Sequence, residues 1–198
     1  MPDLSGVVLT LQHQYEVLGQ RREGPIATVW RGALRGFDVP VDIVVLDSVS
    51  NLGMPAVASR AVAQRIAGVL KSATSVRSPY LLRVMDFGEF EDGTPFFVTD
   101  QSGTTTLADV IAAQGRLPLS GTVQVVQEVA KGLAAMHELG FGHMAVRAEH
   151  IAFEEHSGQS VTRLGGVGLG LLRHEVSVAT GGPLPMGHLA PLTEADSA

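Results

Sequence analysis

The order in which two kinds of hydrophobic periodicity follow each other is the feature that most constrains the fold of this chain. Residues 14–47 contain three β-branched segments, QYEVLGQ, ATVWRGAL and VPVDIVVLD, which are separated by Gly and Pro turns and predict strands. Residues 55–72 have helical spacing. Two more strand segments follow, LLRVMDFGEF and TPFFVTD, joined at Glu91-Asp92-Gly93, where Asp-Gly is a hairpin signal. The first half therefore predicts a strand-rich lobe with one helix.

The periodicity changes after a polar connector at residues 101–106. Residues 107–113 and 119–139 have the 3–4 residue spacing of helices, and two short β-like segments, HIAFEE and SVTRLGGV, come next. From about Ser177 the chain is rich in Gly and Pro, which predicts a loop or tail. The whole order predicts an α+β fold of two lobes with a hinge between them.

Composition excludes several classes of function. The 198 residues contain no cysteine, which excludes disulfides, thiolate catalysis and zinc sites built on sulfur. A net charge of −6 argues against a nucleic-acid or anionic-membrane partner, because both require a basic face. No apolar run reaches the ~18 residues of a membrane span, and MPDLSGVVLTLQHQ lacks the pattern of a signal peptide. We therefore expect a cytoplasmic protein.

Five sequence blocks occur in an order that resembles a known family. They are YEVLGQRREGPIATVWRG, SPYLLRVMDFGEFEDGTPFFVTDQSGTTTLADVI, EVAKGLAAMHELGFGHMAVRAEHIAF, VTRLGGVGLG and GHLAPL. Together they resemble the protein kinase fold, most closely the bacterial Ser/Thr kinases. The resemblance implies an N-terminal extension at 1–13, a kinase-like N-lobe at 14–100, a hinge at 101–106, a partial helical C-lobe at 107–192 and a tail at 193–198.

The visible Asp-Phe-Gly triplet does not lie where a kinase keeps its metal-binding triplet. Asp86-Phe87-Gly88 aligns with the fourth strand of the fold, whereas the metal-binding triplet follows the catalytic loop. At that later place the chain has Gly166-Val167-Gly168. The resemblance therefore implies that the earlier triplet has no role in metal binding.

Several charged positions of the kinase pattern hold other residues. Val44 stands where the family has its phosphate-binding lysine, and Val69 stands where the partner glutamate is placed by counting back from Ser78-Pro79. Replacing both members of a buried ion pair with apolar residues is roughly neutral for stability, whereas losing one costs about 3–5 kcal/mol. The segment Arg22 to Val29 retains one of the three glycines of the nucleotide loop.

The catalytic loop also departs from the pattern. Ala145 stands at the catalytic aspartate, His150 at the metal-binding asparagine and Gly166 at the metal-binding aspartate, while Arg147 keeps a positive charge. We expect His143 to bond backbone near the activation segment and His150 to be a solvated loop residue rather than a metal ligand. The resemblance thus implies a pseudokinase: not an enzyme, without cofactor, metal or ATP/Mg binding, and acting as a protein-binding or regulatory module.

Two alternatives remain open. In one, Arg21, Arg22 and Arg147 hold a nucleotide and support atypical or very weak phosphotransfer, although arginines in a nucleotide loop are more often simply exposed. In the other, the chain is a structural, self-assembling domain. The run GGVGLG at 165–170 does not satisfy the dinucleotide pattern and predicts a flexible loop that opens no helix.

One face of the long predicted helix carries Val123, Val126, Ala130, Leu133 and His137. The helical lobe of the family normally continues past the point where this sequence stops, with helices that cover the long helix. Two explanations remain open. Either the sequence is part of a longer protein, or the domain is shortened and an apolar side of Val123–His137 lacks a cover. In the second case we expect a protein partner of unknown identity or a second copy of the chain to associate with it.

Overall fold

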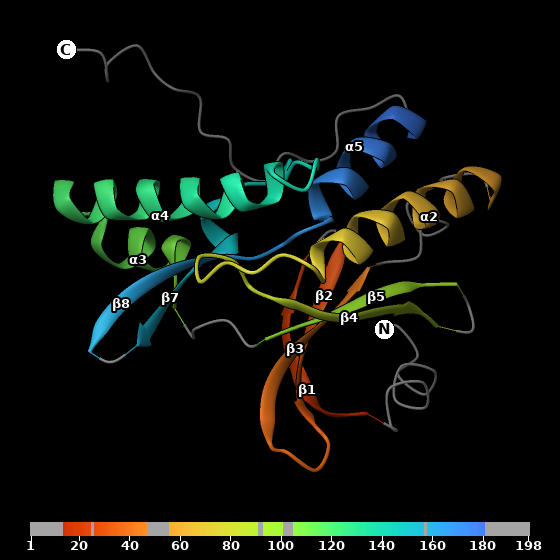
Figure 1. Cartoon of the computed structure of the whole chain (residues 1–198), viewed down its shortest axis with the longest axis horizontal. Coiled ribbons are helices and arrows are strands. Elements are labelled where there is room, and N and C mark those ends of the chain that lie inside the picture. Colours follow the sequence, from red (N-terminus) through yellow and green to blue (C-terminus); the bar gives the residue numbers. More distant parts are fainter. Residues whose placement is uncertain are drawn as a thin grey trace.

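The computed structural model describes residues 14–24, 26–46, 56–90, 93–100, 105–156 and 158–180. Within these ranges the chain forms two lobes, a strand-rich one and a mainly helical one (Figure 1). The predicted hairpin residues Glu91 and Asp92, the hinge residues 101–104 and the segment from 181 onward lie outside the described residues.

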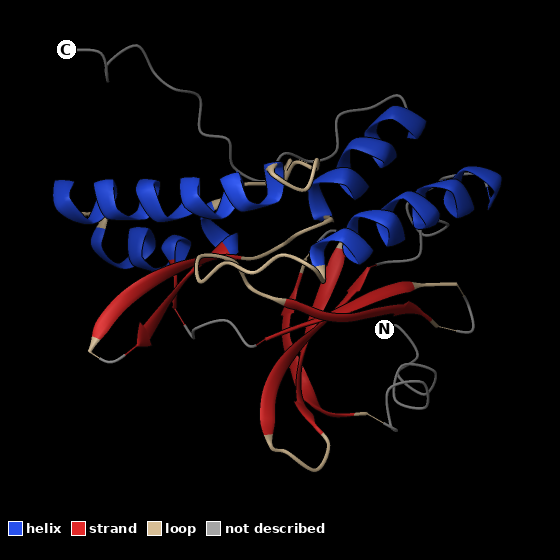
Figure 2. Cartoon of the chain, in the orientation of Figure 1, coloured by secondary structure: helices blue, strands red, loops and turns tan. Residues whose placement is uncertain are grey.

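The first lobe is built on a five-stranded antiparallel sheet, as predicted. Its strands are β1 (Tyr15–Glu23), β2 (Ala27–Leu34), β3 (Val39–Leu46), β4 (Val84–Glu89) and β5 (Pro95–Asp100), in the order β1-β2-β3-β5-β4. The helix α2 (Ala56–Ala73) lies against one face of this sheet (Figure 2). The triplet Asp86-Phe87-Gly88 lies on the fourth strand, β4, as the alignment of motif blocks predicted.

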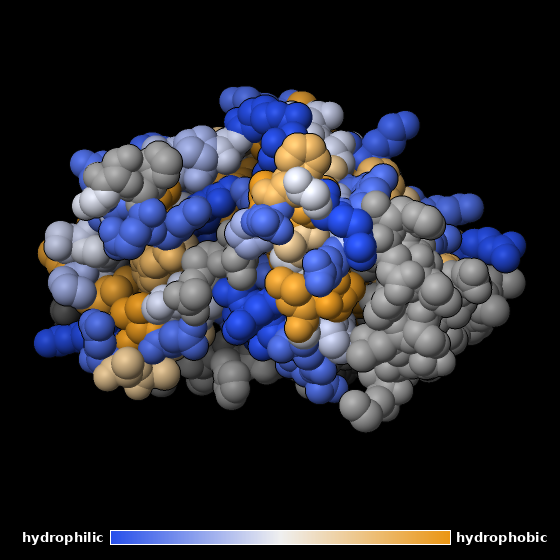
Figure 3. Space-filling model, turned by 90° about the horizontal axis from the view of Figure 1, so that it is seen from below, coloured by the Kyte–Doolittle hydropathy of each residue, from blue (hydrophilic) through white to orange (hydrophobic). Residues whose placement is uncertain are grey.

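The two faces of β3 belong to two separate hydrophobic clusters, because successive side chains of a strand point to opposite sides. Val41, Ile43 and Val45 pack on one side, and Val44 and Leu46 pack on the other with α2. Viewed from below, the molecule shows hydrophobic side chains gathered in separate patches among hydrophilic ones (Figure 3). The continuous apolar run of β3 is thus explained by burial on both faces.

The second lobe begins with β6 (Thr105–Thr106), α3 (Leu107–Gln114) and α4 (Leu119–His137). It continues through the 3₁₀ turn η1 (Ala148–His150), β7 (Ile151–His156), β8 (Gln159–Leu164) and α5 (Leu169–Thr180), with the small sheet ordered β6-β7-β8. A capping box starts α3: the Asp109 amide donates to the Thr106 hydroxyl, and the Asp109 carboxylate accepts from the Thr106 amide. The helices α3 and α4 and the strands β7 and β8 match the predicted elements of this half, whereas β6, η1 and α5 were not predicted.

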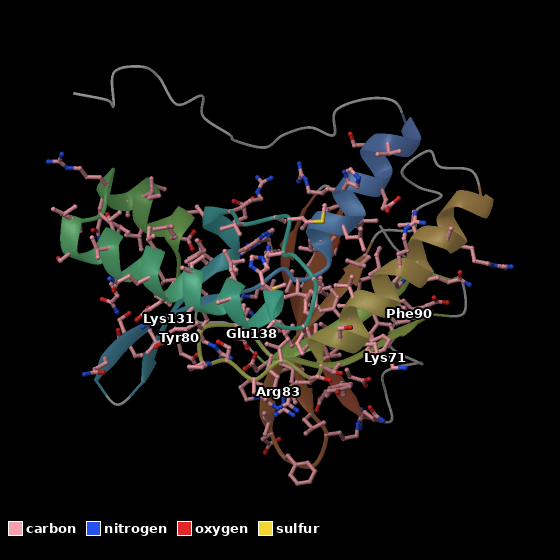
Figure 4. The ribbon with its side chains drawn as sticks, turned by 45° about the horizontal axis from the view of Figure 1, so that its top comes forward. Lys71, Tyr80, Arg83, Phe90, Lys131 and Glu138 are labelled. Carbon is pink, nitrogen blue, oxygen red and sulfur yellow. The ribbon has the colours of Figure 1, made fainter. Side chains whose placement is uncertain are left out.

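The buried face of α4 differs from the stripe that the spacing picked out. Val125, Val129, Gly132 and Met136 are buried, whereas Val123 and Val126 are exposed at 47% and 61%. Gly132 permits a close approach, since a Cβ there would lie 3.0 Å from the Tyr80 carbonyl oxygen. Nearby, the Lys131 ammonium lies 5.1 Å from the centre of the Tyr80 ring (Figure 4).

The prediction that the run GGVGLG at 165–170 opens no helix is wrong, because α5 begins inside that run, at Leu169, and extends past Ser177 to Thr180. Gly166 and Gly168 adopt positive φ of 79° and 86° and turn the chain into the helix. Gly170 lets α5 approach the catalytic-loop segment, because a Cβ there would lie 2.4 Å from the Met144 carbonyl carbon. Four of the six residues 165–170 are glycines, and the sequence alone does not distinguish a glycine that permits close packing from a loop glycine.

The α5 helix lies beside α2 of the first lobe (Figure 1), and Arg65 pairs with Glu175 across them at 2.5 Å. A second connection between the lobes runs through Arg163, which pairs with Asp100 and Glu154 and donates to the Leu81 carbonyl at 2.8 Å. None of the helices in the described residues is long and apolar enough to cross a membrane.

Candidate functional site

A cavity of about 500 Å³ lies between the two lobes. Its walls come from β1, β2, β3 and β5 on one side and from the loop before η1, β7 and α5 on the other. Pockets of roughly 300–1,000 Å³ hold small molecules and cofactors. The volume is therefore that of a ligand site.

One part of the cavity is apolar. Its hydrophobic lining residues are Ile26, Ala27, Val29, Val44, Leu82, Phe97, Ala108, Ala152 and Leu169. Val44 pairs in register with Val29 of β2 and Phe97 of β5, so three apolar side chains stand in a row on the cavity face of the sheet. This part can enclose a flat apolar group such as a nucleotide base.

The other part is charged, and it is lined by Arg21, Arg22, Glu23, Asp42, Arg147, Glu149, His150 and Arg173. Four of these are arginines and three are carboxylates. The cavity wall is therefore more positive than the chain as a whole, which carries a net charge of −6. Such a lining favours an anionic group.

Two consecutive arginines reach the cavity because β1 is irregular. The β1–β2 register shifts between Gln20 and Arg22, so the alternation of side chains between the two faces is interrupted there. Arg21 pairs with Asp42 of β3 at 2.5 Å, with the two side chains only 11% and 6% exposed. The expectation of exposed surface arginines is therefore wrong for Arg21.

The catalytic-loop segment is held by histidines. His143 is 2% exposed; its Nε2–H donates to the Gly165 carbonyl at 2.8 Å, and its Nδ1 accepts from the Ala145 amide. Burial lowers the pKa of His143 to about 4, with a smaller contribution from the charge of His150. The structural role expected for His143 is confirmed.

His150 is not the solvated residue that was expected. It is half-buried, lines the cavity, and donates from Nδ1 to the Ala145 carbonyl at 2.7 Å. Burial is the main cause that lowers its pKa, and the charges of Arg147 and Arg22 act in the same direction. His150 is therefore a neutral group that ties η1 to the loop before it.

Glu149 brings two of the arginines together. Arg147 forms an ion pair with the Glu149 carboxylate, and Arg22 donates to the Glu149 backbone carbonyl at 2.9 Å. Burial opposes the charge of Glu149, but a backbone hydrogen bond and then Arg147 outweigh it, so the pKa of Glu149 is lowered. The β1 strand and the catalytic loop thus meet at this residue.

The structure brings together most, but not all, of the positions singled out in the sequence. Val44, His150 and Gly166 line the cavity, and Ala145 is buried beside it. Val69 packs, partly buried, against the hydrophobic core and is not among the lining residues. Sequence reasoning missed Arg173, because α5 was predicted as a loop, and Asp42, because nothing marked its pairing with β1.

The residues present do not suit a divalent metal. Magnesium prefers oxygen ligands in a near-octahedral arrangement. Among the described residues no group of three or more His, Cys, Asp or Glu side chains could hold a metal ion. At the two ligand positions the chain has His150, whose Nδ1 is bonded to Ala145, and Gly166, which has no side chain.

A sheet-and-helix lobe, a helical lobe and a cavity between them define a protein kinase-like domain. The kinase domain of Mycobacterium tuberculosis PknI is a structural neighbour, with a TM-score of 0.67, 19% sequence identity, and coverage of 86% of this chain and 75% of that one. This likeness confirms the predicted fold class.

Relatives in sequence are bacterial serine/threonine-protein kinases. The probable kinase pknA2 of Bifidobacterium longum is 26% identical over 155 residues, covering 78% of this chain and 20% of that protein. PknL of M. tuberculosis is 28% identical over 146 residues, covering 73% of this chain and 35% of that protein. The chain thus spans about a fifth to a third of the length of these relatives. No protein-family model matches it.

The comparisons correct one expectation. The chain was expected not to be an enzyme, on the ground of its altered motif positions. Its relatives are named as serine/threonine-protein kinases, which points to an enzyme instead. The altered residues at the kinase motif positions were therefore not a sufficient reason to exclude enzymatic activity.

Proposed function

We propose that this chain is a kinase-like domain that binds a nucleoside triphosphate between its lobes and transfers the γ-phosphoryl group slowly to a serine or threonine hydroxyl. The observation that carries the proposal is the lining of the cavity, which combines apolar side chains with four arginines. The kinases among its relatives support the same reaction class.

The apolar part suits the base and the arginine part suits the phosphates. The base would lie against Val44, Phe97 and Ala152, all less than 8% exposed in the described structure and all facing the cavity. Arg21, Arg22 and Arg147 would supply positive charge in place of the lysine that Val44 replaces. Guanidinium groups bind phosphate oxygens in pairs, so they can fulfil this role.

Slow transfer follows from the residues near the reacting group. Phosphoryl transfer passes through a loose transition state, so most of the catalysis is positioning and charge stabilisation. The bond between the γ-phosphorus and the bridging oxygen breaks, and the nucleoside diphosphate leaves with that oxygen and the bonding electron pair. The acceptor oxygen takes the phosphoryl group, and the acceptor proton goes to water. Ala145 offers no carboxylate to orient that hydroxyl, so we propose a rate well below that of kinases with the aspartate.

The five substituted positions belong to this proposal. Val44, Val69, Ala145, His150 and Gly166 are proposed to be the places where kinase charges have been exchanged for apolar or neutral groups. At such a site, binding energy comes from the cavity walls and the arginines rather than from a lysine–glutamate pair and a metal.

A thermal-shift titration with ATP tests the binding step. Ligand at a hundred times its dissociation constant stabilises the folded state by about 2.7 kcal/mol, which for a chain of this size is roughly 5–10 °C in Tm. Ala152→Leu places a larger side chain in the cavity wall and should remove the shift. Ala112→Leu, at an exposed position on α3, is the matched control and should keep it.

Transfer is tested with γ-labelled ATP and a generic serine/threonine substrate, with the Ala152→Leu variant as the blank. Label that appears with the wild-type chain and not with the variant supports the proposal. No thermal shift at millimolar ATP would refute the binding step, and a shift without any label would refute the transfer step.

A second candidate function is protein binding. Leu119, Val123 and Val126 of α4 are exposed at 81%, 47% and 61%. Grouped exposed apolar side chains mark association surfaces. We propose a protein partner or a second copy of the chain here. Light scattering of wild type and Val126→Asp tests self-association, which the variant should weaken.

A further inference from the structure

Three arginines from three different elements line the cavity. Arg22 comes from β1, Arg147 precedes η1, and Arg173 lies on α5. Arg22 and Arg147 both contact Glu149, the first through its backbone carbonyl and the second through its carboxylate. Segments that lie more than a hundred residues apart in the sequence therefore build one cationic wall.

The electrostatic effects of these residues on each other show that the charges are close. Burial lowers the pKa of Arg173, and the charge of Arg147 lowers it further. Arg147 and Arg22 both act to lower the pKa of His150, after the larger effect of burial. Like charges held near one another repel, so an anion placed among them would be bound favourably.

The charged lining of the cavity contains four arginines and three carboxylates. Asp42 is paired with Arg21, Glu149 is paired with Arg147, and Glu23 follows Arg22 in β1. Burial lowers the pKa of His150, so this residue adds no positive charge near pH 7. A triphosphate carries the charge density that would match this wall.

In a kinase a divalent metal normally neutralises part of that charge. Here the residues at the metal positions are His150 and Gly166, and the described residues contain no set of metal ligands. We propose that Arg22, Arg147 and Arg173 form a phosphate site that holds the triphosphate without a divalent metal. This inference rests on the proposed nucleotide binding and adds Arg173, on α5, as a binding residue.

The position of Arg173 makes the site depend on the docking of α5. Gly170, one turn earlier, packs against His143 and Met144, and Glu175 pairs with Arg65 of α2. Both contacts hold α5 against the rest of the molecule. Arg173 therefore lies on a helix that is fixed by one contact before this residue, at Gly170, and one contact after it, at Glu175.

The experiment is a calorimetric titration of the full chain with adenosine, with ATP in EDTA, and with ATP in magnesium. We expect ATP in EDTA to bind at least tenfold more tightly than adenosine, because the phosphates add charge-assisted hydrogen bonds to the arginines. Arg173→Gln should weaken ATP binding about tenfold and leave adenosine binding unchanged. Arg116→Gln, which removes the same charge from an exposed loop position, should change neither.

The outcomes separate this inference from the proposed function. If ATP binds only when magnesium is present, or if Arg173→Gln binds ATP as tightly as wild type in EDTA, the metal-free arginine site is wrong and nucleotide binding stands. If adenosine binds and the phosphates of ATP add nothing, the site is equally wrong. If neither adenosine nor ATP binds under any condition, the proposed function falls as well.

Discussion

The Arg21–Asp42 ion pair allows a quantitative test of how this cavity is built. The two groups are 2.5 Å apart, with side chains 11% and 6% exposed. At an effective dielectric constant of 20 their Coulomb attraction is about 7 kcal/mol. Most of this is offset by the cost of removing both charges from water. The pair should therefore add little net stability while making each partner costly to remove alone.

Arg21→Met leaves the buried Asp42 carboxylate without the Arg21 guanidinium. Removal of one partner from a buried pair costs about 3–5 kcal/mol. We expect about 3 kcal/mol here, the lower end, because Asp42 lines an open cavity that water can enter. The double variant Arg21→Met/Asp42→Leu removes both charges and should recover to within about 1 kcal/mol of wild type.

Urea denaturation at pH 7 measures these differences in the free energy of unfolding, provided that the m-value stays constant. The control is the pair of Arg65 and Glu175, whose side chains are 52% and 18% exposed. Arg65→Gln should cost no more than about 1 kcal/mol, as exposed pairs do. If Arg21→Met costs as little as Arg65→Gln, or if the double variant is no more stable than the worse single one, the reasoning about a desolvated pair is refuted.

Two further predictions concern stability. Gly170→Ala should destabilise the chain by about 1–3 kcal/mol, because the added Cβ would meet the backbone of His143 and Met144. The control, Gly68→Ala on α2, has open space around its Cβ and should stabilise the chain by up to about 1 kcal/mol. Equal urea midpoints for the two variants would contradict this prediction. His143 has a pKa of about 4 when folded and about 6.5 when unfolded, so the unfolded chain binds more protons between these values. Its contribution is fully present above pH 6.5 and is lost as the pH falls toward 4, by an amount on the order of 3 kcal/mol, with the lowered pKa of His150 acting in the same direction. Urea denaturation at pH 7, 6 and 5 measures this loss, and His143→Gln should flatten the dependence of the free energy of unfolding on pH. A wild-type chain that gains stability on acidification would show the assignment to be wrong.

The periodicity of the sequence determined the two-lobed α+β architecture. Local hydrophobic alternation or helical spacing in the sequence indicates most of the elements. These are strands β1 to β5, the helices α2, α3 and α4, and the hairpin of β7 and β8. The order of motif blocks was equally local information. Of the positions that it singled out, Val44, His150 and Gly166 line the cavity, and the Ala145 carbonyl accepts a hydrogen bond from His150. These features depend on residues that are near each other in the chain.

What only the tertiary structure decided depends on contacts between distant segments. The helix α5 forms in a glycine-rich run because it packs against α2 and the loop at His143, and propensity alone gave a loop there. A register shift in β1 turned Arg21 toward Asp42, and the docking of α5 brought Arg173 to the cavity. The charge of a site is the sum of the charges of the residues that folding brings together. The arginine lining of this cavity therefore could not be predicted from any one stretch of the sequence.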